Sequence, residues 1–92
     1  MKIVEEYNNF QEDLLEIKSA KYIGDFAIRI LFNDGVNRLV DFKPFLESSL
    51  HPSIRKYLDE RLFEKFDLID GNLNWNDYDL IFPIDNLYEG RL

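Results

Sequence analysis

The feature that most constrains the fold is a turn flanked by two strand-like segments. Residues 26–32 carry an apolar side chain at every second position, and residues 36–42 are again rich in β-branched and aromatic types. Between them lies Asn33-Asp34-Gly35, in which Asp-Gly supplies the positive φ that tight hairpin turns require. The segment therefore predicts an antiparallel β-hairpin. The side chains expected on its buried face are Phe26, Ile28, Ile30 and Phe32.

Shorter elements are predicted on both sides of this hairpin. Ile17–Ile23 reads as a strand before it. Lys43-Pro44 ends the second strand, because proline has no amide hydrogen for the ladder, and Phe45–Leu50 is expected to be a loop or a single turn. Pro52 suits the first position of a helix. The side chains expected to face inward from that helix are Ile54, Tyr57 and Leu58.

A second hairpin is predicted near the end of the chain. Phe66–Asp70 and Leu73–Asn76 read as strands on either side of a turn at Asp70-Gly71-Asn72. Leu80–Phe82 is a last short apolar run. Asp85 is the expected N-cap of a terminal helical turn that Gly90 closes.

These elements predict one domain of α+β class over residues 1–92, with a small antiparallel sheet built from hairpins and two or three short helices. Residues 16–92 form its core. Residues 1–15 are an acidic amphipathic stretch in which Tyr7, Phe10 and Leu14 recur at helical spacing. This stretch either docks on the domain as a helix, which we favour, or orders only against a partner.

Composition excludes several classes of function. The chain has no cysteine, which removes disulfides, thiolate zinc sites and cysteine nucleophiles, and favours the reducing cytoplasm. Its acidic start lacks the apolar run of a signal peptide, and no stretch is long enough to span a bilayer. A formal net charge of −7 disfavours direct binding to nucleic acid and to anionic membranes.

Possible catalytic or metal-binding residues each have a simpler interpretation. Oxygen-bearing side chains at alternate positions from Asp70 to Asn76 suit a hard cation, but they equally suit the solvent face of a strand, which we favour. His51 lies close in sequence to Ser48 and Ser49, yet adjacent loop residues rarely converge as nucleophile and base. Asp77 and Asp79 form either an acid/base pair or turn contacts. We therefore expect no enzyme, no cofactor and no metal.

Several short motifs follow one another in a characteristic order along the chain. They are Phe32-Asn33-Asp34-Gly35, Asp41, Leu58-Asp59 with Phe63, Trp75, Asp79-Leu80 and Leu87-Tyr88-Glu89. In this order the chain resembles the small bacterial domains of unknown function called DUF2442, over roughly Ile17 to Glu89. One departure is Asn76-Asp77-Tyr78, which replaces the Pro-Asn-Gly-type turn usual after the tryptophan.

The resemblance implies a compact α+β fold with an antiparallel sheet and short helices. It also implies that Asp41 or Asp79 accepts backbone amide hydrogen bonds. Some relatives carry an added helix-turn-helix, and because the sequence stops at Leu92 we expect this DNA-binding addition to be absent here. Others lie beside small proteins in toxin–antitoxin-type pairs, and any function inferred from them is analogy.

Two functions remain after these exclusions. The first is a non-enzymatic protein-interaction module, the acidic member of such a pair, whose partner is another small and basic protein; a homodimer is an alternative assembly. The second is a small-ligand-binding domain with a pocket near Trp75. The candidate interaction residues are Trp75, Asp79 and Tyr88. For Trp75 and Tyr88 core packing carries more weight than a role as exposed anchors.

Overall fold

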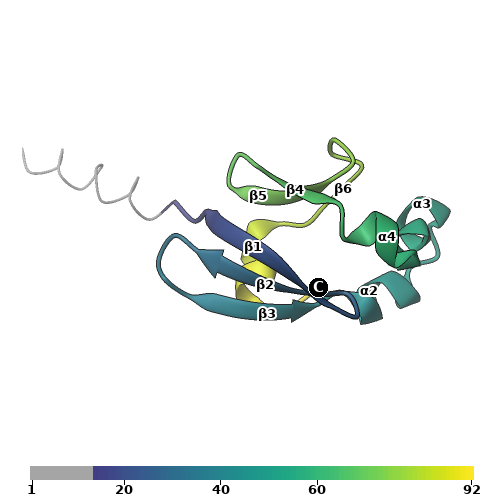
Figure 1. The fold of residues 1–92 in the computed structure, drawn as a ribbon, viewed down its shortest axis with the longest axis horizontal. Coiled ribbons are helices and arrows are strands. Elements are labelled where there is room, and N and C mark those ends of the chain that lie inside the picture. Colours follow the sequence, from purple (N-terminus) through teal and green to yellow (C-terminus); the bar gives the residue numbers. More distant parts are fainter. Residues whose placement is uncertain (1–13) are drawn as a thin grey trace, which may run out of the picture.

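A computed structural model describes residues 14–92 of the chain, so residues 1–13 of the predicted acidic stretch lie outside the described part. The described residues form six β-strands, four α-helices and one 3₁₀ turn (Figure 1). In chain order these are β1 (Ile17–Gly24), β2 (Ala27–Phe32), β3 (Asn37–Asp41), α2 (Lys43–Ser48), α3 (Pro52–Arg55), η1 (Lys56–Leu58), α4 (Glu60–Phe63), β4 (Phe66–Ile69), β5 (Asn72–Trp75), β6 (Leu80–Ile81) and α5 (Ile84–Glu89).

The first sheet contains the predicted hairpin, with strand order β1-β2-β3 and antiparallel pairing throughout. The turn between β2 and β3 closes with a 3.0 Å hydrogen bond from the Gly35 amide to the Phe32 carbonyl, and Gly35 has a φ of 92°. This is the three-residue type of hairpin loop, in which the last residue needs a positive φ. The four side chains expected on the buried face are buried, so the prediction is confirmed.

The second sheet has strand order β4-β5-β6, also antiparallel. Its first hairpin has a two-residue turn in which Asp70 and Gly71 have φ values of 50° and 80°. Positive φ at both central residues matches the right-handed twist of the flanking strands, which is why Asp-Gly is favoured there. The backbone amide of Ile17 donates a 2.7 Å hydrogen bond to the Gly71 carbonyl and so connects β1 to this turn.

The helices differ from the prediction in two places. Lys43–Ser48 is helix α2, where the sequence predicted a strand end at Lys43-Pro44 followed by a loop or a single turn. The helix begins earlier than expected because proline is tolerated in the first turn of a helix as well as ending a strand. Pro83, and not Asp85, is the N-cap of α5, and Asp85 lies in its first turn. The end of α5 is as predicted, since Gly90 adopts the left-handed conformation with φ 74°.

A single apolar core joins the two sheets, which lie one above the other in Figure 1 with α2–α4 at one end. Phe42, which directly follows β3, contacts Trp75 of β5 and Phe82 after β6 at ring-centroid distances of 5.7 and 5.2 Å. Edge-to-face packing of this kind is the favourable geometry for aromatic pairs. Two antiparallel sheets with short helices confirm the α+β class.

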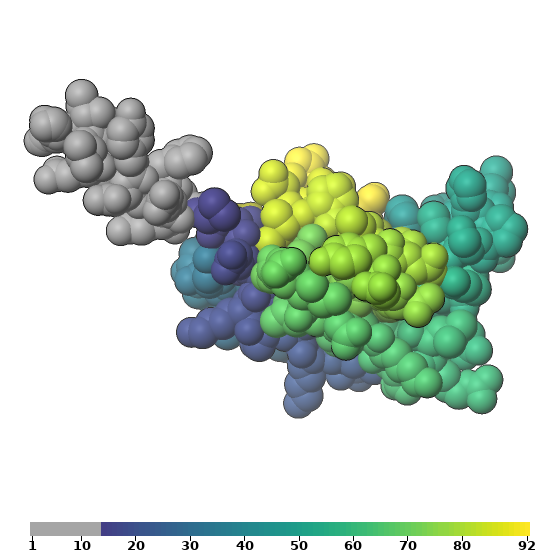
Figure 2. Space-filling model, turned by 90° about the horizontal axis from the view of Figure 1, so that it is seen from above, coloured from purple at the N-terminus to yellow at the C-terminus, as the bar shows by residue number. Residues whose placement is uncertain are grey.

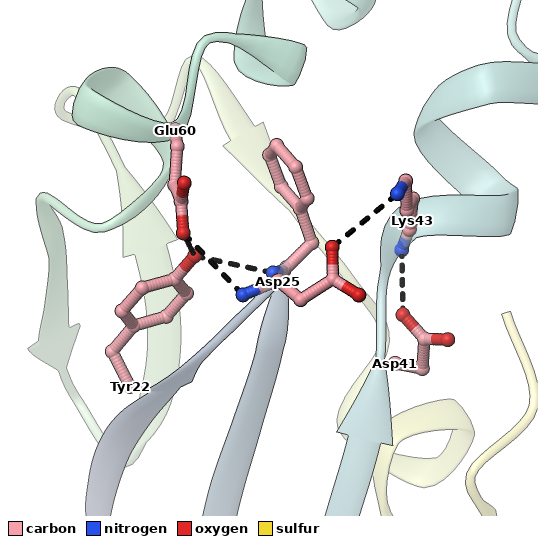
Figure 3. A network of polar contacts seen from close by, with 6 residues as sticks. Tyr22, Asp25, Asp41, Lys43 and Glu60 are labelled. Carbon is pink, nitrogen blue, oxygen red and sulfur yellow. Dashed lines mark hydrogen bonds and ion pairs between the residues drawn. The ribbon is translucent and has the colours of Figure 1, made fainter.

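A polar network joins the β1–β2 turn to the helical end of the domain (Figure 3). The Tyr22 hydroxyl donates to the Glu60 carboxylate and accepts a 3.1 Å hydrogen bond from the Phe26 amide. The ammonium group of Lys43 lies 3.3 Å from the Asp25 carboxylate. Burial, followed by the bond to Glu60, raises the pKa of Tyr22. These contacts position α2 and α4 against the first sheet.

Candidate functional site

Trp75 lies entirely inside the core. Its side chain has an exposed fraction of 0%, its ring stacks on Phe63 at a centroid distance of 5.4 Å, and its indole Nε1 donates a 2.7 Å hydrogen bond to the Phe63 carbonyl. The packing interpretation of Trp75 therefore holds. Its alternative role as an exposed anchor is corrected, because none of the indole reaches the surface.

Asp79 lies at the surface directly above this part of the core. Its Oδ2 accepts a 2.8 Å hydrogen bond from the Tyr57 hydroxyl and lies 2.7 Å from Nζ of Lys56. Hydrogen bonds from Lys56 and Tyr57 lower the pKa of Asp79. Burial, together with the bond to Asp79, raises the pKa of Tyr57 to about 12. Asp79 thus fixes the loop between β5 and β6 to the 3₁₀ turn η1.

The other family aspartate gives the expected backbone contact. Oδ1 of Asp41 accepts a 3.1 Å hydrogen bond from the Lys43 amide, at the start of α2. The resemblance implied that Asp41 or Asp79 would accept such a bond, and Asp41 does.

The loop between β5 and β6 contains a left-handed turn. Asn76, Asp77 and Tyr78 have φ values of 51°, 54° and 71°, so three consecutive non-glycine residues occupy the left-handed region. The Tyr78 amide donates to Oδ1 of Asn74, and the Asp79 amide donates to the Trp75 carbonyl at 2.9 Å.

The burial of Asn74 contradicts the prediction that the polar side chains at alternate positions from Asp70 to Asn76 form the solvent face of a strand. Its exposed fraction is 2%, because the left-handed turn covers it and takes up its side-chain oxygen. Asn72 is also engaged within the fold: its Nδ2 donates to the Phe82 carbonyl at 2.9 Å and its Oδ1 accepts from the Leu73 amide at 2.8 Å. Across residues 14–92, no group of three or more His, Asp or Glu side chains is placed to hold a metal ion.

A surface hollow of about 370 Å³ lies next to Asp79. It is bounded by η1, α4, β4 and the left-handed turn. Asp67, on the wall of the hollow, pairs across the sheet with Asn74, the residue before Trp75. The side chains that line it are Lys56, Tyr57, Leu62, Lys65, Asp67 and Asn76.

Ile81 lies on the same side of the second sheet as Asp67 of the hollow, because both pair with Asn74, and the exposed residue Tyr78 lies in the loop that leads to Ile81. Ile81 pairs across the sheet with Asn74 and is 51% exposed, and Tyr78, whose amide Asn74 binds, is 54% exposed. Figure 2 looks onto this side of the sheet, which faces away from the first sheet. We refer to Tyr78, Ile81 and the residues that line the hollow as the second-sheet surface.

Tyr88 belongs to another part of the fold. Its ring packs edge-on against Phe32 at 5.0 Å, and its hydroxyl donates a 2.6 Å hydrogen bond to Oδ2 of Asp34. Its backbone carbonyl accepts a 2.6 Å bond from Nε of Arg38. In the described residues no hydrogen bond or ring contact joins Tyr88 to Trp75 or Asp79, so the three candidates do not form one site.

The residues around His51 make local backbone contacts. The Ser48 hydroxyl donates to the Phe45 carbonyl at 3.1 Å, and Oγ of Ser49 accepts a 3.2 Å bond from the His51 amide. No bond between a serine hydroxyl and the imidazole is present in residues 14–92. These serines act in turn and helix-end structure.

Sequence reasoning missed Tyr78 and Ile81. The signal that could have identified Tyr78 was the departure from the family pattern at Asn76-Asp77-Tyr78, where a turn that usually contains glycine carries none. A bulky residue in place of a turn glycine imposes a backbone cost, which makes its side chain of interest.

Comparison with known proteins identifies the family. The family model described as protein of unknown function (DUF2442) matches residues 17–92, which include every described strand and helix. Neither the curated proteins nor the solved structures give a match. None of the helices in residues 14–92 has both the length and the apolar character needed to cross a membrane. The chain belongs to the DUF2442 family.

Proposed function

We propose that this chain is a non-catalytic, cytoplasmic protein-interaction module that binds another small protein through the second-sheet surface. One observation carries the proposal: Tyr78 and Ile81 are each more than half exposed, and both adjoin Asn74, since the Tyr78 amide donates to the Asn74 side chain and Ile81 is the strand partner of Asn74. Asn76 of the same loop lines the surface hollow. An exposed aromatic and an exposed aliphatic side chain next to a concavity are typical of protein-binding surfaces, in which tyrosine is enriched.

The charge of the chain favours a basic partner. A net charge of −7 accelerates encounter with a positively charged protein and opposes association with a second copy of the same chain. The proposal therefore prefers a heteromeric pair, of the kind in which this chain is the acidic member of a toxin–antitoxin-type couple, over a homodimer.

The polar groups beside the surface support a binding role without catalysis. Asp79 is held by Lys56 and Tyr57, and its lowered pKa keeps it ionised at neutral pH. A general acid needs the opposite shift, and a general base needs a free lone pair facing a substrate. Asp79 instead holds the loop that carries Tyr78.

Co-purification with matched variants tests the proposal. The tagged chain is isolated from its native cells at low and high salt, and the recovered proteins are quantified by mass spectrometry. We expect one small basic protein, recovered less well at high salt and lost with Tyr78→Ala and Ile81→Ala. Leu39→Ala is the control, since Leu39 is 56% exposed on β3 of the first sheet. A chain that emerges alone, or equal loss with Leu39→Ala, argues against the proposal.

A second candidate function rests on the hollow itself. Its volume of about 370 Å³ lies within the usual range of small-molecule sites, and it combines an apolar wall at Leu62 with the charged groups of Lys65 and Asp67. Fragment screening by NMR tests it. Saturable shifts at Lys65 and Asn76 that disappear in Leu62→Trp support a ligand site. Weak shifts spread over the whole surface count against one.

A further inference from the structure

The backbone of the left-handed turn is unfavourable for one of its residues in particular. Asn76 and Asp77 are among the few non-glycine types that tolerate a positive φ, whereas Tyr78, with a φ of 71°, is a bulky residue that rarely does so. A left-handed backbone is strained for an L-residue other than glycine, asparagine or aspartate. Such strain persists only where surrounding contacts enforce it, and it is concentrated at functional sites.

The contacts that enforce the turn do not involve the Tyr78 side chain. They run from the Tyr78 amide to Asn74 and from the Asp79 amide to the carbonyls of Trp75 and Asn76, at 2.9 and 3.3 Å. Among residues 14–92 no hydrogen bond reaches the Tyr78 hydroxyl and no aromatic ring packs on its own. A glycine would make the same backbone hydrogen bonds without strain, so the hydrogen bonds of the turn give no reason for a tyrosine here.

The neighbours of Tyr78 indicate the chemistry that it recognises. Asp77 precedes it in the turn, exposed and without an ion-pair partner in the described residues, and the exposed Ile81 follows three residues after Tyr78. An aromatic face beside a carboxylate suits a guanidinium group, which stacks on the ring and pairs with the oxygens. An aliphatic side chain next to them suits an apolar residue of the same ligand segment.

The lysines of the hollow leave this preference intact. Lys56 is paired with Asp79 at 2.7 Å, and Lys65 shares the hollow with Asp67. When Asp77 and Asp79, which adjoin the hollow, are counted with Asp67, there are three carboxylates against two ammonium groups. A cationic ligand therefore meets a net negative surface, as it does for the whole chain.

We infer that the left-handed turn is a recognition element for arginine: it holds the Tyr78 ring and the Asp77 carboxylate against an arginine side chain of a basic segment, while an adjacent apolar residue packs on Ile81. The inference rests on the proposed function in taking a protein segment as the ligand. It adds the residue type that is recognised and the two side chains that recognise it.

Defined peptides test the inference on the full chain. The probes are acetylated, amidated hexapeptides in which leucine alternates with arginine, lysine or glutamate, titrated into isotope-labelled protein and followed by NMR. We expect the arginine peptide to shift residues 76–81, the lysine peptide to bind more weakly, and the glutamate peptide to leave them unchanged. Shifts centred elsewhere, or equal binding of the glutamate peptide, overturn the inference.

Matched variants separate the turn from the overall charge. Tyr78→Leu is expected to weaken arginine-peptide binding roughly 2–5-fold, and Asp77→Asn by about the same factor. Asp70→Asn is the control, because it removes the same charge from the exposed turn between β4 and β5. If Asp70→Asn weakens binding as much as Asp77→Asn does, binding depends only on net charge and the inference is wrong.

Stability gives a readout that needs no ligand. Tyr78→Gly is expected to raise the midpoint of thermal unfolding by several degrees while abolishing the preference for arginine. A lower midpoint shows that the tyrosine serves the fold, which contradicts the inference. Failure to recover a partner from cells counts against the proposed function, whereas failure of the arginine peptide to shift residues 76–81 counts against this inference.

Discussion

The hydroxyl of Tyr88 donates a 2.6 Å hydrogen bond to Oδ2 of Asp34, which joins the last helix to the turn of the first hairpin. The same turn is held by the Val36 amide, which donates to Oδ1 of Asp34 at 3.0 Å. Both bonds lower the pKa of Asp34, the one from Tyr88 most. Two motifs of the family, one around Asp34-Gly35 and one around Tyr88, are thus the two halves of one structural contact.

Tyr88→Phe is expected to lower stability modestly. The change removes the bond to Asp34 but keeps the ring against Phe32, and the loss is small because the pair is exposed to water. Urea denaturation should show a lower midpoint with an unchanged slope. When Asp34→Asn is already present, Tyr88→Phe should lower stability less than it does in the wild type. If the losses of stability from the two changes are fully additive, the two side chains are not in direct contact.

Trp75→Ala is expected to be the most damaging of these substitutions. Emptying a fully buried aromatic site costs roughly 3–5 kcal/mol, a large part of the stability of a domain of this size. Trp75→Phe is the milder comparison, because it keeps an aromatic ring and removes the donor to the Phe63 carbonyl. Circular dichroism during urea denaturation measures both. A Trp75→Ala protein with wild-type stability would show that the indole does not support the core.

Stability is expected to fall in acid, in part through Asp79. Its pKa in the fold is below the ordinary value of 3.8, so its contribution is complete above that value and is lost as the pH drops through the lowered one. Thermal unfolding between about pH 5 and about pH 2 should therefore be less pH-dependent in Asp79→Asn than in the wild type. Equal pH dependence in the two proteins would contradict the lowered pKa.

The alkaline side provides the complementary measurement. The pKa of Tyr57 is raised from 10.0 to about 12, so the neutral phenol stabilises the fold fully below 10.0, and this contribution is lost as the pH rises towards 12. Tyr57→Phe should remove this alkaline loss. Ultraviolet titration of phenolate formation should show a tyrosine that ionises near pH 12 in the wild type and is missing from the variant.

Gly71→Ala is expected to destabilise the second hairpin. Gly71 has a φ of +80°, and an added Cβ would lie 2.8 Å from Cγ of Glu16. The Glu16 side chain can move, so most of the cost comes from the backbone, at roughly 1–2 kcal/mol. Gly35→Ala is a comparison with a similar φ of +92° and open space around the added atom. If only Gly71→Ala destabilises, the contact with Glu16 and not the backbone is the cause.

The parts of the fold that follow from local chemistry were predictable from the sequence. Both Asp-Gly turns and the end of α5 at Gly90 depend on residues adjacent in sequence, and they are where they were expected. Helix α2 was predicted only as a loop or a single turn, because Pro44 is compatible with both a strand end and a first helical turn, and only the packing of Leu46 into the core decides between them.

The candidate site was harder to predict, because tertiary contacts create it. The left-handed turn exists through Asn74, whose burial contradicts the alternation that the strand pattern suggests. Tyr78 therefore looked like one more residue of a polar loop. Trp75 and Tyr88 were candidate interaction residues with core packing as the favoured interpretation; the indole is buried in the core, and Tyr88 joins α5 to the first hairpin.

The single core has a consequence for the integrity of the chain. Neither three-stranded sheet has an interior of its own, because Phe42 packs against Trp75 and Phe82 from the other half. A sheet of this size is stable in water only when its hydrophobic face is packed. Cleavage of the backbone between Glu64 and Lys65 would thus produce two fragments, each presenting aromatic surface that only the other can cover. The two halves of the chain therefore stabilise each other as the two subunits of an obligate heterodimer do.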